Sequence, residues 1–304
     1  MASPAISVLM TTYNSERYVA ESIESVLNQT FSDFELIIND DHSRDSTLGI
    51  AQRYARLDPR IRVSVNDRNY GDYANRRLTA ALARGRFLKY HDSDDVMYRH
   101  CLAAMVEPLD AEPRAAFALS GPRFWPGGAC PMLLTPALAY EREYLGSGLF
   151  YLGPPSALFR ADAFRELGGF GDEPFSSDFL FWLRACARVN VLLVAGDLFY
   201  YRIHPDQQSS HPGNAAATAR AASIEWEMLN SAECPLSEDA CEQAKRNVTV
   251  SLLRAGFRHA RRGAWGTAWV TVHGPRLGAS AWLRYLRRPR RSATAGTPPP
   301  KPCP

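Results

Sequence analysis

The first hundred residues alternate between short apolar runs and amphipathic segments, and this alternation limits the fold more than any other feature of the sequence. Runs typical of buried parallel strands occupy residues 6–10, 34–38, 61–65 and 86–90. Segments with helical spacing lie between them, at residues 19–30, 46–54 and 73–83, and Asn14 and Ser15 can cap the first helix. Strands joined by helices form right-handed crossovers, so the sequence predicts an α/β protein with a mostly parallel central sheet flanked by helices.

Composition excludes several classes of protein. Hydrophobic residues make up 46% and charged residues 22% of the 304 residues, which is typical of a globular chain. No apolar run approaches the roughly 20 residues that a membrane-spanning helix needs, and residues 1–5 do not resemble a signal peptide. The six cysteines contain no Cys-x-x-Cys pair, so neither a disulfide framework nor a zinc cluster is expected. A cytoplasmic, reducing location is favoured.

The net charge of +3 conceals an uneven distribution. Residues 243–304 carry 13 basic side chains and no acidic one, so the rest of the chain is acidic. An amphipathic helix is predicted at residues 247–262, and a basic, Pro-rich tail, partly disordered, at residues 276–304. Two interpretations stay open: peripheral contact with an anionic membrane, or docking on the protein's own acidic body. No nucleic-acid motif is present, so no nucleic-acid partner is expected.

Polar clusters follow three of the predicted strands. Ligands bind at the carboxyl ends of the strands in such sheets, so the clusters predict one shared cleft. Asp92-x-Asp94-Asp95 offers the hard oxygen ligands that suit Mg²⁺ or Mn²⁺, although a solvated turn also explains it. Asp40 and Asp41 suit either an Asx turn or a contact with a nucleobase or ribose. The Gly-rich signatures of dinucleotide sites and P-loops are missing.

Several motifs follow one another along the chain. The opening segments are residues 6–14, 25–31 and 35–47, and the acidic cluster Asp92-Ser93-Asp94-Asp95 comes after them. Three later motifs are Gly168-Gly169-Phe170, Ser177 to Arg184, and Tyr201-Arg202-Ile203-His204. Taken in this order, the motifs resemble those of family 2 glycosyltransferases over roughly residues 5–210, and the acidic cluster looks like the DxD motif of that family. The resemblance implies a GT-A, Rossmann-like fold, here with a C-terminal helical extension.

The resemblance also implies roles for individual residues. The donor- and nucleotide-binding residues would be Thr11, Tyr13, Asp40, Asp41, Asp92 and Ser93. The metal ligands would be Asp92 and Asp94, with Asp95 and His204 as further contacts. Asp178 matches the catalytic base, although an acid at a helix start also interacts favourably with the helix dipole. His204 also suits a plain hydrogen-bonded histidine.

Some positions depart from the family pattern or lack a clear role. His42 replaces a common Gly, Ser177 replaces a common Glu, and His91 stands where an apolar residue is typical. His91 suits either tuning of the metal site or lining of the strand end. For Arg76 and Arg77, on a helix expected to be exposed, a solvated position is favoured over a contact with diphosphate.

The predicted function is a metal-dependent, inverting transfer of a sugar from a UDP-, GDP- or dTDP-linked donor, with Mn²⁺ or Mg²⁺ as cofactor. The acceptor would be a glycan or a lipid-linked hydroxyl in bacterial surface polysaccharide or glycoconjugate synthesis, at or near the inner face of the cell membrane. Alternatives are a polyprenyl-phosphate glycosyltransferase and an inactive nucleotide- or glycan-binding module. Residues 1–100 would bind the donor, residues 101–210 would hold the acceptor and the base, and residues 211–275 would form the helical extension.

Overall fold

The computed structural model describes residues 3–120, 130–146, 148–171, 176–196, 198–205, 207, 214–273 and 275. Its centre is an eight-stranded sheet with the order β3-β2-β1-β4-β8-β6-β9-β7. The strands are β1 (Ile6–Thr12), β2 (Phe34–Asp40), β3 (Ile61–Val65), β4 (Phe87–Asp92), β6 (Ala115–Ser120), β7 (Met132–Leu134), β8 (Ala157–Arg160) and β9 (Asn190–Val194). In this sheet only β7 and β8 run against the other strands, so the predicted mostly parallel sheet is confirmed for the described residues.

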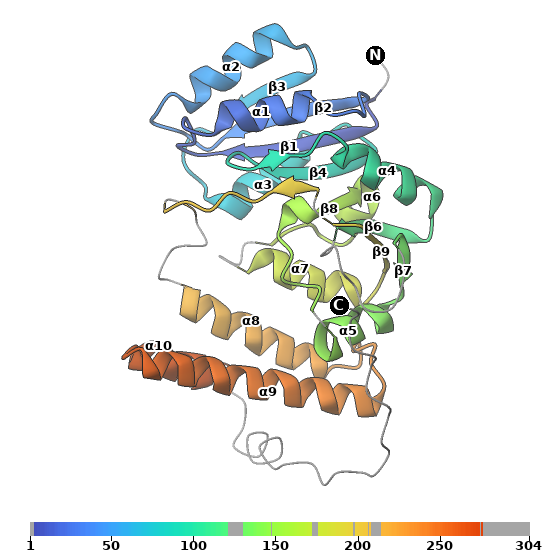
Figure 1. Ribbon diagram of the computed structural model, residues 1–304, viewed down its shortest axis with the longest axis vertical. Coiled ribbons are helices and arrows are strands. Elements are labelled where there is room, and N and C mark those ends of the chain that lie inside the picture. Colours follow the sequence, from blue (N-terminus) through green and yellow to red (C-terminus); the bar gives the residue numbers. More distant parts are fainter. Residues whose placement is uncertain are drawn as a thin grey trace, which may run out of the picture.

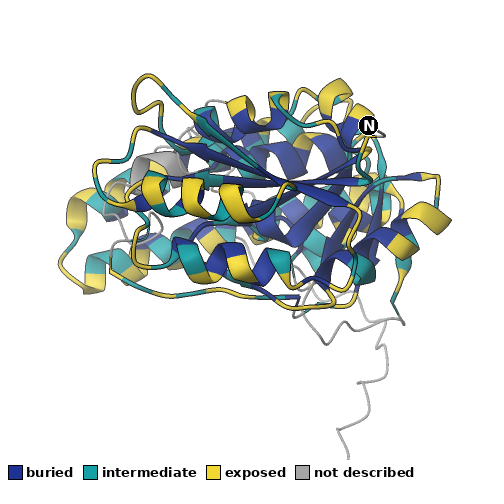
Figure 2. Cartoon of the chain, turned by 90° about the horizontal axis from the view of Figure 1, so that it is seen from above, coloured by how far each residue is buried: buried dark blue, intermediate teal, exposed yellow. Residues whose placement is uncertain are grey.

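Helices cover both faces of the sheet (Figure 1). They are α1 (Val19–Leu27), α2 (Thr47–Leu57), α3 (Asp72–Ala81), α4 (Cys101–Ala111), α5 (Pro136–Leu145), α6 (Ala161–Glu166) and α7 (Ser177–Cys186), with a 3-10 helix η1 (Pro154–Ser156). Alternate side chains of the strands enter two hydrophobic clusters, because successive residues of a strand point to opposite faces. Val8 and Met10 of β1 pack toward α1, α2 and α4, whereas Leu9 packs toward the face of α3 and α7. Figure 2 shows the buried strands between helices whose outer sides are exposed.

The predicted strands of the first hundred residues are all present, but three of them are longer than expected. β1, β2 and β4 each continue two residues beyond the apolar run, to Thr12, Asp40 and Asp92. Helix α1 begins at Val19, as the helical spacing predicted, but its N-cap is Tyr18 and not Asn14 or Ser15, because Tyr18 N and Val19 N both donate to the Ser15 carbonyl in a tight turn. Polar site residues therefore lie on the strands themselves and take their direction from the sheet.

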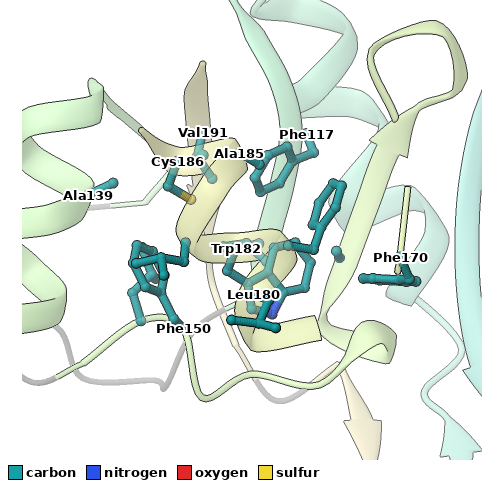
Figure 3. Packing of buried hydrophobic residues seen from close by; sticks show 14 of the residues in the cluster. Phe117, Ala139, Phe150, Phe170, Leu180, Trp182, Ala185, Cys186 and Val191 are labelled. Carbon is teal, nitrogen blue, oxygen red and sulfur yellow. The ribbon is translucent and has the colours of Figure 1, made fainter. Parts of the chain in front are cut away.

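Helix α7 is held in an aromatic core (Figure 3). The Trp182 ring stacks on Phe159, with a centroid distance of 5.7 Å and an interplanar angle of 5°. Trp182 Nε1 donates to the Leu152 carbonyl at 2.7 Å, and the Tyr140 hydroxyl donates to the Leu183 carbonyl at 2.6 Å. These contacts fix the helix, and with it the first turn that carries Asp178.

Three C-terminal helices lie at the end of the molecule away from α1 and α2 (Figure 1). They are α8 (Asn214–Leu229), α9 (Glu238–Arg261) and α10 (Trp265–His273), so the predicted helix at 247–262 is the second part of a longer one. Helix α10 folds back onto α9 so closely that a Cβ atom at Gly256 would lie 2.4 Å from Val272 Cγ2. No helix of the described part of the chain is long and apolar enough to cross a membrane. The basic tail at 276–304 lies outside the described residues.

Candidate active site

Three polar strand ends meet at one edge of the sheet. In the strand register Thr12 is paired with Asp40, and Thr11 is paired with Asp92. Thr11 is half-buried, and the following residue, Tyr13, is 46% exposed. An aromatic ring so exposed at this edge offers a face on which a base can stack.

The Asp40 carboxylate is engaged within its own loop. Thr12 Oγ1 donates to Asp40 Oδ1 at 2.9 Å, Ser43 Oγ donates to the same oxygen at 2.6 Å, and Ser43 N donates to Oδ2 at 2.8 Å. The turn includes His42 with φ +65°, a left-handed conformation that glycine adopts without strain. This conformation favours glycine, which accounts for the Gly that is common at the position of His42. These contacts show the local turn at Asp40, and its contact with a nucleobase or ribose stays a prediction.

The Asp41 carboxylate binds a different segment, the loop before α3. Its carboxylate accepts hydrogen bonds from Asn66 Nδ2 at 2.7 Å, from Tyr70 N at 3.0 Å and from Gly71 N at 2.8 Å. Gly71 is the N-cap of α3 with φ +86°, so Asp41 fixes the loop that leads into this helix. Asp41 thereby sets the position of α3 beside the cleft.

Arg76 of α3 is the central cation of the site, and the solvated position favoured from the sequence is wrong. The residue is only 7% exposed, since the helix turns its Asn75–Arg76 side toward the sheet. Arg76 Nε lies 2.8 Å from Asp72 Oδ1, and Arg76 Nη2 lies 2.8 Å from Asp92 Oδ1. Burial raises the pKa of Asp72, and the Arg76 charge opposes that rise. Arg77, the next residue, is exposed.

Asp178 borders the same cluster. It lies in the first turn of α7, where Asp178 Oδ1 accepts a hydrogen bond from Phe179 N at 2.8 Å. Burial raises the pKa of its carboxyl, while hydrogen bonds from Phe179 N and Tyr73 and the charge of Arg76 oppose the rise. The charge of Asp178 also acts on Asp72. The structure therefore brings Asp178 and Asp92 together around one guanidinium.

The acidic loop after β4 is completed by a distant segment. A two-stranded ribbon pairs β5 (Val96–Met97) with β10 (Phe199–Tyr200) in antiparallel fashion. Beyond it, Arg202 N donates to Asp95 Oδ1 at 3.0 Å, and Arg202 Nε donates to the Asp94 carbonyl at 2.8 Å. His204 Nε2 lies 2.9 Å from Asp94 Oδ2. His204 and Asp94 are thus neighbours, and the role of His204 at a metal or diphosphate stays a prediction.

The carboxyls of this loop resist ionisation. Burial, followed by the charge of Asp92, raises the pKa of Asp94 and raises that of Asp95 to about 8. Asp95 Oδ2 is buried and has no hydrogen-bond partner among the described residues, and the same holds for His204 Nδ1. A nearby cation would relieve both the crowded negative charge and the unsatisfied acceptor.

The loop fits a divalent ion that a substrate helps to hold. Among the described residues, no group of three His, Cys, Asp or Glu side chains could hold a metal ion alone. Mg²⁺ in proteins is commonly bound through one or two carboxylates plus substrate phosphates, and Mn²⁺ also prefers oxygen ligands. Asp94, with His204 at 2.9 Å, meets that smaller requirement.

Two serines and a histidine support the loop from behind. His91 is buried against α1, where its Nε2 lies 3.1 Å from Ser22 Oγ, and Ser22 Oγ in turn lies 3.0 Å from the Asp92 carbonyl. Burial, followed by the charge of Lys89, lowers the pKa of His91 to about 3, so the imidazole is neutral. His91 therefore lines the strand and braces Asp92 through Ser22. Ser93 Oγ lies 2.9 Å from Ser15 Oγ, which ties the loop to the end of β1.

Sequence reasoning assigned no function to Arg202 and did not identify Asp72 or Tyr73. Asp72 and Arg76 stand four apart on a helix, which is the spacing of a salt bridge and was the available signal. Arg202 lies within the motif Tyr201 to His204, but the motif did not reveal its partners, because Asp94 and Asp95 come from a distant part of the chain.

Comparisons with known proteins bear on the family and the fold of this chain. Residues 7–168 match the family described as Glycosyl transferase family 2. EpsH of Bacillus subtilis, whose name describes a glycosyltransferase, is 41% identical over 95 residues, which cover 31% of this chain and 27% of EpsH. The poly(ribitol-phosphate) beta-N-acetylglucosaminyltransferase TarS of Staphylococcus aureus strain MW2 is 30% identical over 200 residues, which cover 64% of this chain and 35% of TarS. The chain thus spans about a quarter to a third of the length of these two relatives.

Solved structures share the fold. Residues 1–349 of S. aureus TarS in complex with UDP-GlcNAc superimpose with a TM-score of 0.64 at 19% identity, covering 89% of this chain and 91% of that one. The mannosyltransferase PcManGT from Pyrobaculum calidifontis, in complex with GDP-Man and Mn²⁺, gives a TM-score of 0.58 at 17% identity, covering 94% and 86%. The expected GT-A fold is therefore confirmed. With the family match over more than half its length, the chain belongs to glycosyl transferase family 2.

Proposed function

We propose that this chain transfers a sugar from a nucleotide-diphosphate donor to an acceptor hydroxyl, with a divalent ion and with inversion at the anomeric carbon. The observation that carries the proposal is the cluster in which the buried Arg76 joins the half-buried DxD aspartate Asp92 to the surroundings of Asp178. Related proteins bind such donors: TarS was solved with UDP-GlcNAc, and PcManGT with GDP-Man and Mn²⁺. The names of two relatives refer to teichuronic acid and poly(ribitol-phosphate), which supports a bacterial surface polymer as the acceptor.

Asp94 and His204 would hold Mn²⁺ or Mg²⁺, with Asp92 and Asp95 beside them. When bound, the ion stabilises the negative charge that gathers on the leaving diphosphate. Arg76 adds a fixed positive charge on the same side, since it already neutralises Asp92. Residues 1–100 would bind the nucleotide, with the exposed ring of Tyr13 against the base and Thr11 beside it.

Asp178 would act as the base. The acceptor hydroxyl loses a proton as it attacks, and a carboxylate within hydrogen-bond reach can take it. Burial raises the pKa of Asp178 and so makes it a stronger base than an exposed aspartate. Attack from the face opposite the leaving diphosphate inverts the anomeric centre. Residues 101–210 would hold the acceptor around this base, and residues 211–275 would form an extension outside the reaction.

The test of this assignment is Asp178→Asn with Asp162→Asn as the matched control. Asp162 lies in the first turn of α6, and its Oδ1 accepts a hydrogen bond from the next residue at 2.8 Å, as Asp178 Oδ1 does. Asp178→Asn should lower turnover by about 10²–10⁴-fold while donor affinity stays unchanged. Asp162→Asn should leave both unchanged. Near-normal turnover of Asp178→Asn would refute the base assignment.

Metal dependence is tested by calorimetry of Mn²⁺ and nucleotide-diphosphate binding to Asp94→Ala and His204→Ala. Both variants should bind the ion and nucleotide together at least tenfold more weakly than the parent, because each loses a direct ligand. If both variants bind as tightly as the parent, the DxD assignment is refuted.

The alternative functions need different assays. Metal-dependent hydrolysis of a donor separates a transferase from an inactive binding module. Transfer to polyprenyl phosphate instead of a glycan would identify the other enzymatic alternative.

We also propose that the C-terminal helices rest on an anionic membrane surface. Phe257, Trp265 and Trp269 are 66%, 71% and 63% exposed, and Trp265 and Trp269 lie one turn apart on α10. Arg258 and Arg261, both exposed, lie on the neighbouring last turns of α9. Exposed aromatic rings beside basic side chains are the combination that binds the interface of a bilayer.

Co-sedimentation with vesicles tests this surface. The parent should bind phosphatidylglycerol vesicles and not phosphatidylcholine vesicles, and a Trp265→Ser, Trp269→Ser double variant should bind several-fold more weakly. Leu57→Ser, at a 76% exposed position of α2, serves as the control. Equal binding by the double variant and the control would contradict the proposal.

A further inference from the structure

The corner between α8 and α9 brings two thiols together. Cys234 Sγ lies 3.9 Å from Cys241 Sγ, and both residues are half-buried. Cys241 Sγ also lies 2.9 Å from the Leu229 carbonyl at the end of α8, to which the thiol can donate. Cys101 and Cys186, in contrast, are fully buried. The pair serves no role in the proposed transfer reaction.

Both cysteines are held by well-defined backbone. Cys241 lies in the first turn of α9, where Ser237 is the N-cap and its carbonyl accepts from Cys241 N at 2.8 Å. Cys234 N donates to the Ser231 carbonyl at 3.3 Å in the turn after α8. A disulfide needs sulfurs about 2.05 Å apart. The sulfurs therefore need to approach by about 2 Å, and a change of side-chain rotamer moves a sulfur atom by that order.

The two thiols differ in their surroundings. Burial, followed by the neighbouring Cys234, raises the pKa of Cys241, while Lys245 one turn further opposes the rise. Cys241 therefore ionises less readily than an exposed cysteine, and its thiol can donate to the Leu229 carbonyl. Cys234 lies in the turn ahead of the helix and is half-buried, so it is partly accessible to a dissolved disulfide.

We propose that Cys234 and Cys241 form a reversible disulfide by exchange with a small disulfide such as oxidised glutathione. The Cys234 thiolate attacks one glutathione sulfur, which forms a mixed disulfide and releases one glutathione thiolate. Cys241 loses its proton and attacks the Cys234 sulfur, which releases the second glutathione thiolate. Two protein thiols are oxidised, one glutathione disulfide is reduced by two electrons, and the two protons pass to the released thiolates.

The bond would fix the junction between the extension and the catalytic part. Arg188 Nη2 lies 3.0 Å from Glu233 Oε2, next to Cys234, and Asn247 Nδ2 donates to the Tyr144 carbonyl at 2.7 Å on the α9 side. Both sides of the corner are thus attached to the domain that carries Asp178. A disulfide there limits local opening of the corner, because it restrains the unfolded segment between residues 234 and 241.

The experiment equilibrates the full chain in buffers of reduced and oxidised glutathione, traps free thiols by alkylation and maps them by mass spectrometry. Both cysteines fall in one tryptic peptide, residues 221–245, since no Lys or Arg lies between Arg220 and Lys245. The expected result is loss of two hydrogen atoms from this peptide, protection of both its thiols from alkylation, and a higher Tm that reductant reverses. Cys130→Ser and Cys303→Ser should behave like the parent, and Cys241→Ser should lose the Tm increase.

Three results would overturn the proposal. They are a glutathione adduct on Cys234 that never resolves, cross-links between separate chains, and unchanged thiols at every glutathione ratio. Cys234→Ser provides a second check, because it must abolish the intrapeptide bond while the secondary structure measured by circular dichroism stays unchanged.

Discussion

Replacement of Arg76 by methionine tests the electrostatic centre of the site. The change keeps a long apolar stem and removes a guanidinium that contacts Asp72 and Asp92, each at 2.8 Å. Removal of one partner of a buried ion pair costs about 3–5 kcal/mol, since the remaining charge is left uncompensated. Unfolding entropy of about 2.1 cal/mol/K per residue gives roughly 0.6 kcal/mol/K for this chain, so Tm should fall by about 5–8 °C.

The assay is thermal unfolding followed by circular dichroism, at two pH values. Arg77→Met is the matched control, because Arg77 is the next residue of the same helix and is exposed. The loss should be smaller at pH 5 than at pH 8, since burial raises the pKa of Asp72 and protonation then relieves the unpaired charge. A double-mutant cycle with Asp72→Asn should give a coupling energy above about 1 kcal/mol. A Tm of Arg76→Met within 1–2 °C of Arg77→Met, roughly 1 kcal/mol, would refute the reasoning.

Two further variants probe the loop and the sheet. Asp95→Asn should raise the Tm of the metal-free protein at pH 8 and leave it unchanged near pH 4. Burial raises the pKa of Asp95 in the folded protein to about 8, whereas the pKa in the unfolded chain is roughly 4. The stability that the Asp95 carboxyl contributes is therefore fully present below about pH 4 and is lost as the pH rises through 8. Pre-incubation with Mn²⁺ should reduce the difference, and a variant less stable than the parent at pH 8 would contradict the assignment. Gly85→Ala should destabilise the protein by about 1–3 kcal/mol in urea unfolding, because the added Cβ would lie 2.4 Å from Ser7 N. Gly49→Ala, in α2 with nothing within 4 Å of the added Cβ, should instead stabilise it by roughly 0.5–1 kcal/mol, and equal effects of the two changes would show that the close approach at Gly85 is not rigid.

The sequence was sufficient for the parts of the fold that depend on local periodicity. The alternation of apolar runs and helices predicts β1 to β4 and α1 to α3, because each strand and its helix are neighbours in the chain. It did not predict the burial of Arg76, since the inward side of α3 is itself polar, with Asn75 and Thr79 beside Arg76. A helix with polar residues on both sides gives no hydrophobic pattern from which its inner side can be read.

The sequence also did not show that the carboxylates of Asp40 and Asp41 have different roles. Asp40 and Asp41 are adjacent and identical in type, yet one closes its own turn and the other holds the loop before α3. The difference comes from Tyr70 N and Gly71 N, which reach Asp41 only after α3 has packed on the sheet. The position of His204 next to Asp94 likewise depends on the pairing of β5 with β10, which no local pattern encodes.

The ribbon of β5 and β10 determines the order in which the parts of the site form while the chain is synthesised on the ribosome. Asp95 and Arg202 are 107 positions apart, so Asp95 is made long before Arg202, whose backbone amide donates a hydrogen bond to the Asp95 carboxylate. Domains begin to fold from the N-terminus while synthesis continues, and β1 to β4 need only short-range crossovers. A nascent chain can thus acquire its Tyr13 and Asp92 strand ends early, whereas Arg202 and His204 complete the acidic loop only after residue 204 has been made. We therefore expect affinity for metal and donor to appear late and abruptly during translation, as a property of the finished sheet and ribbon together.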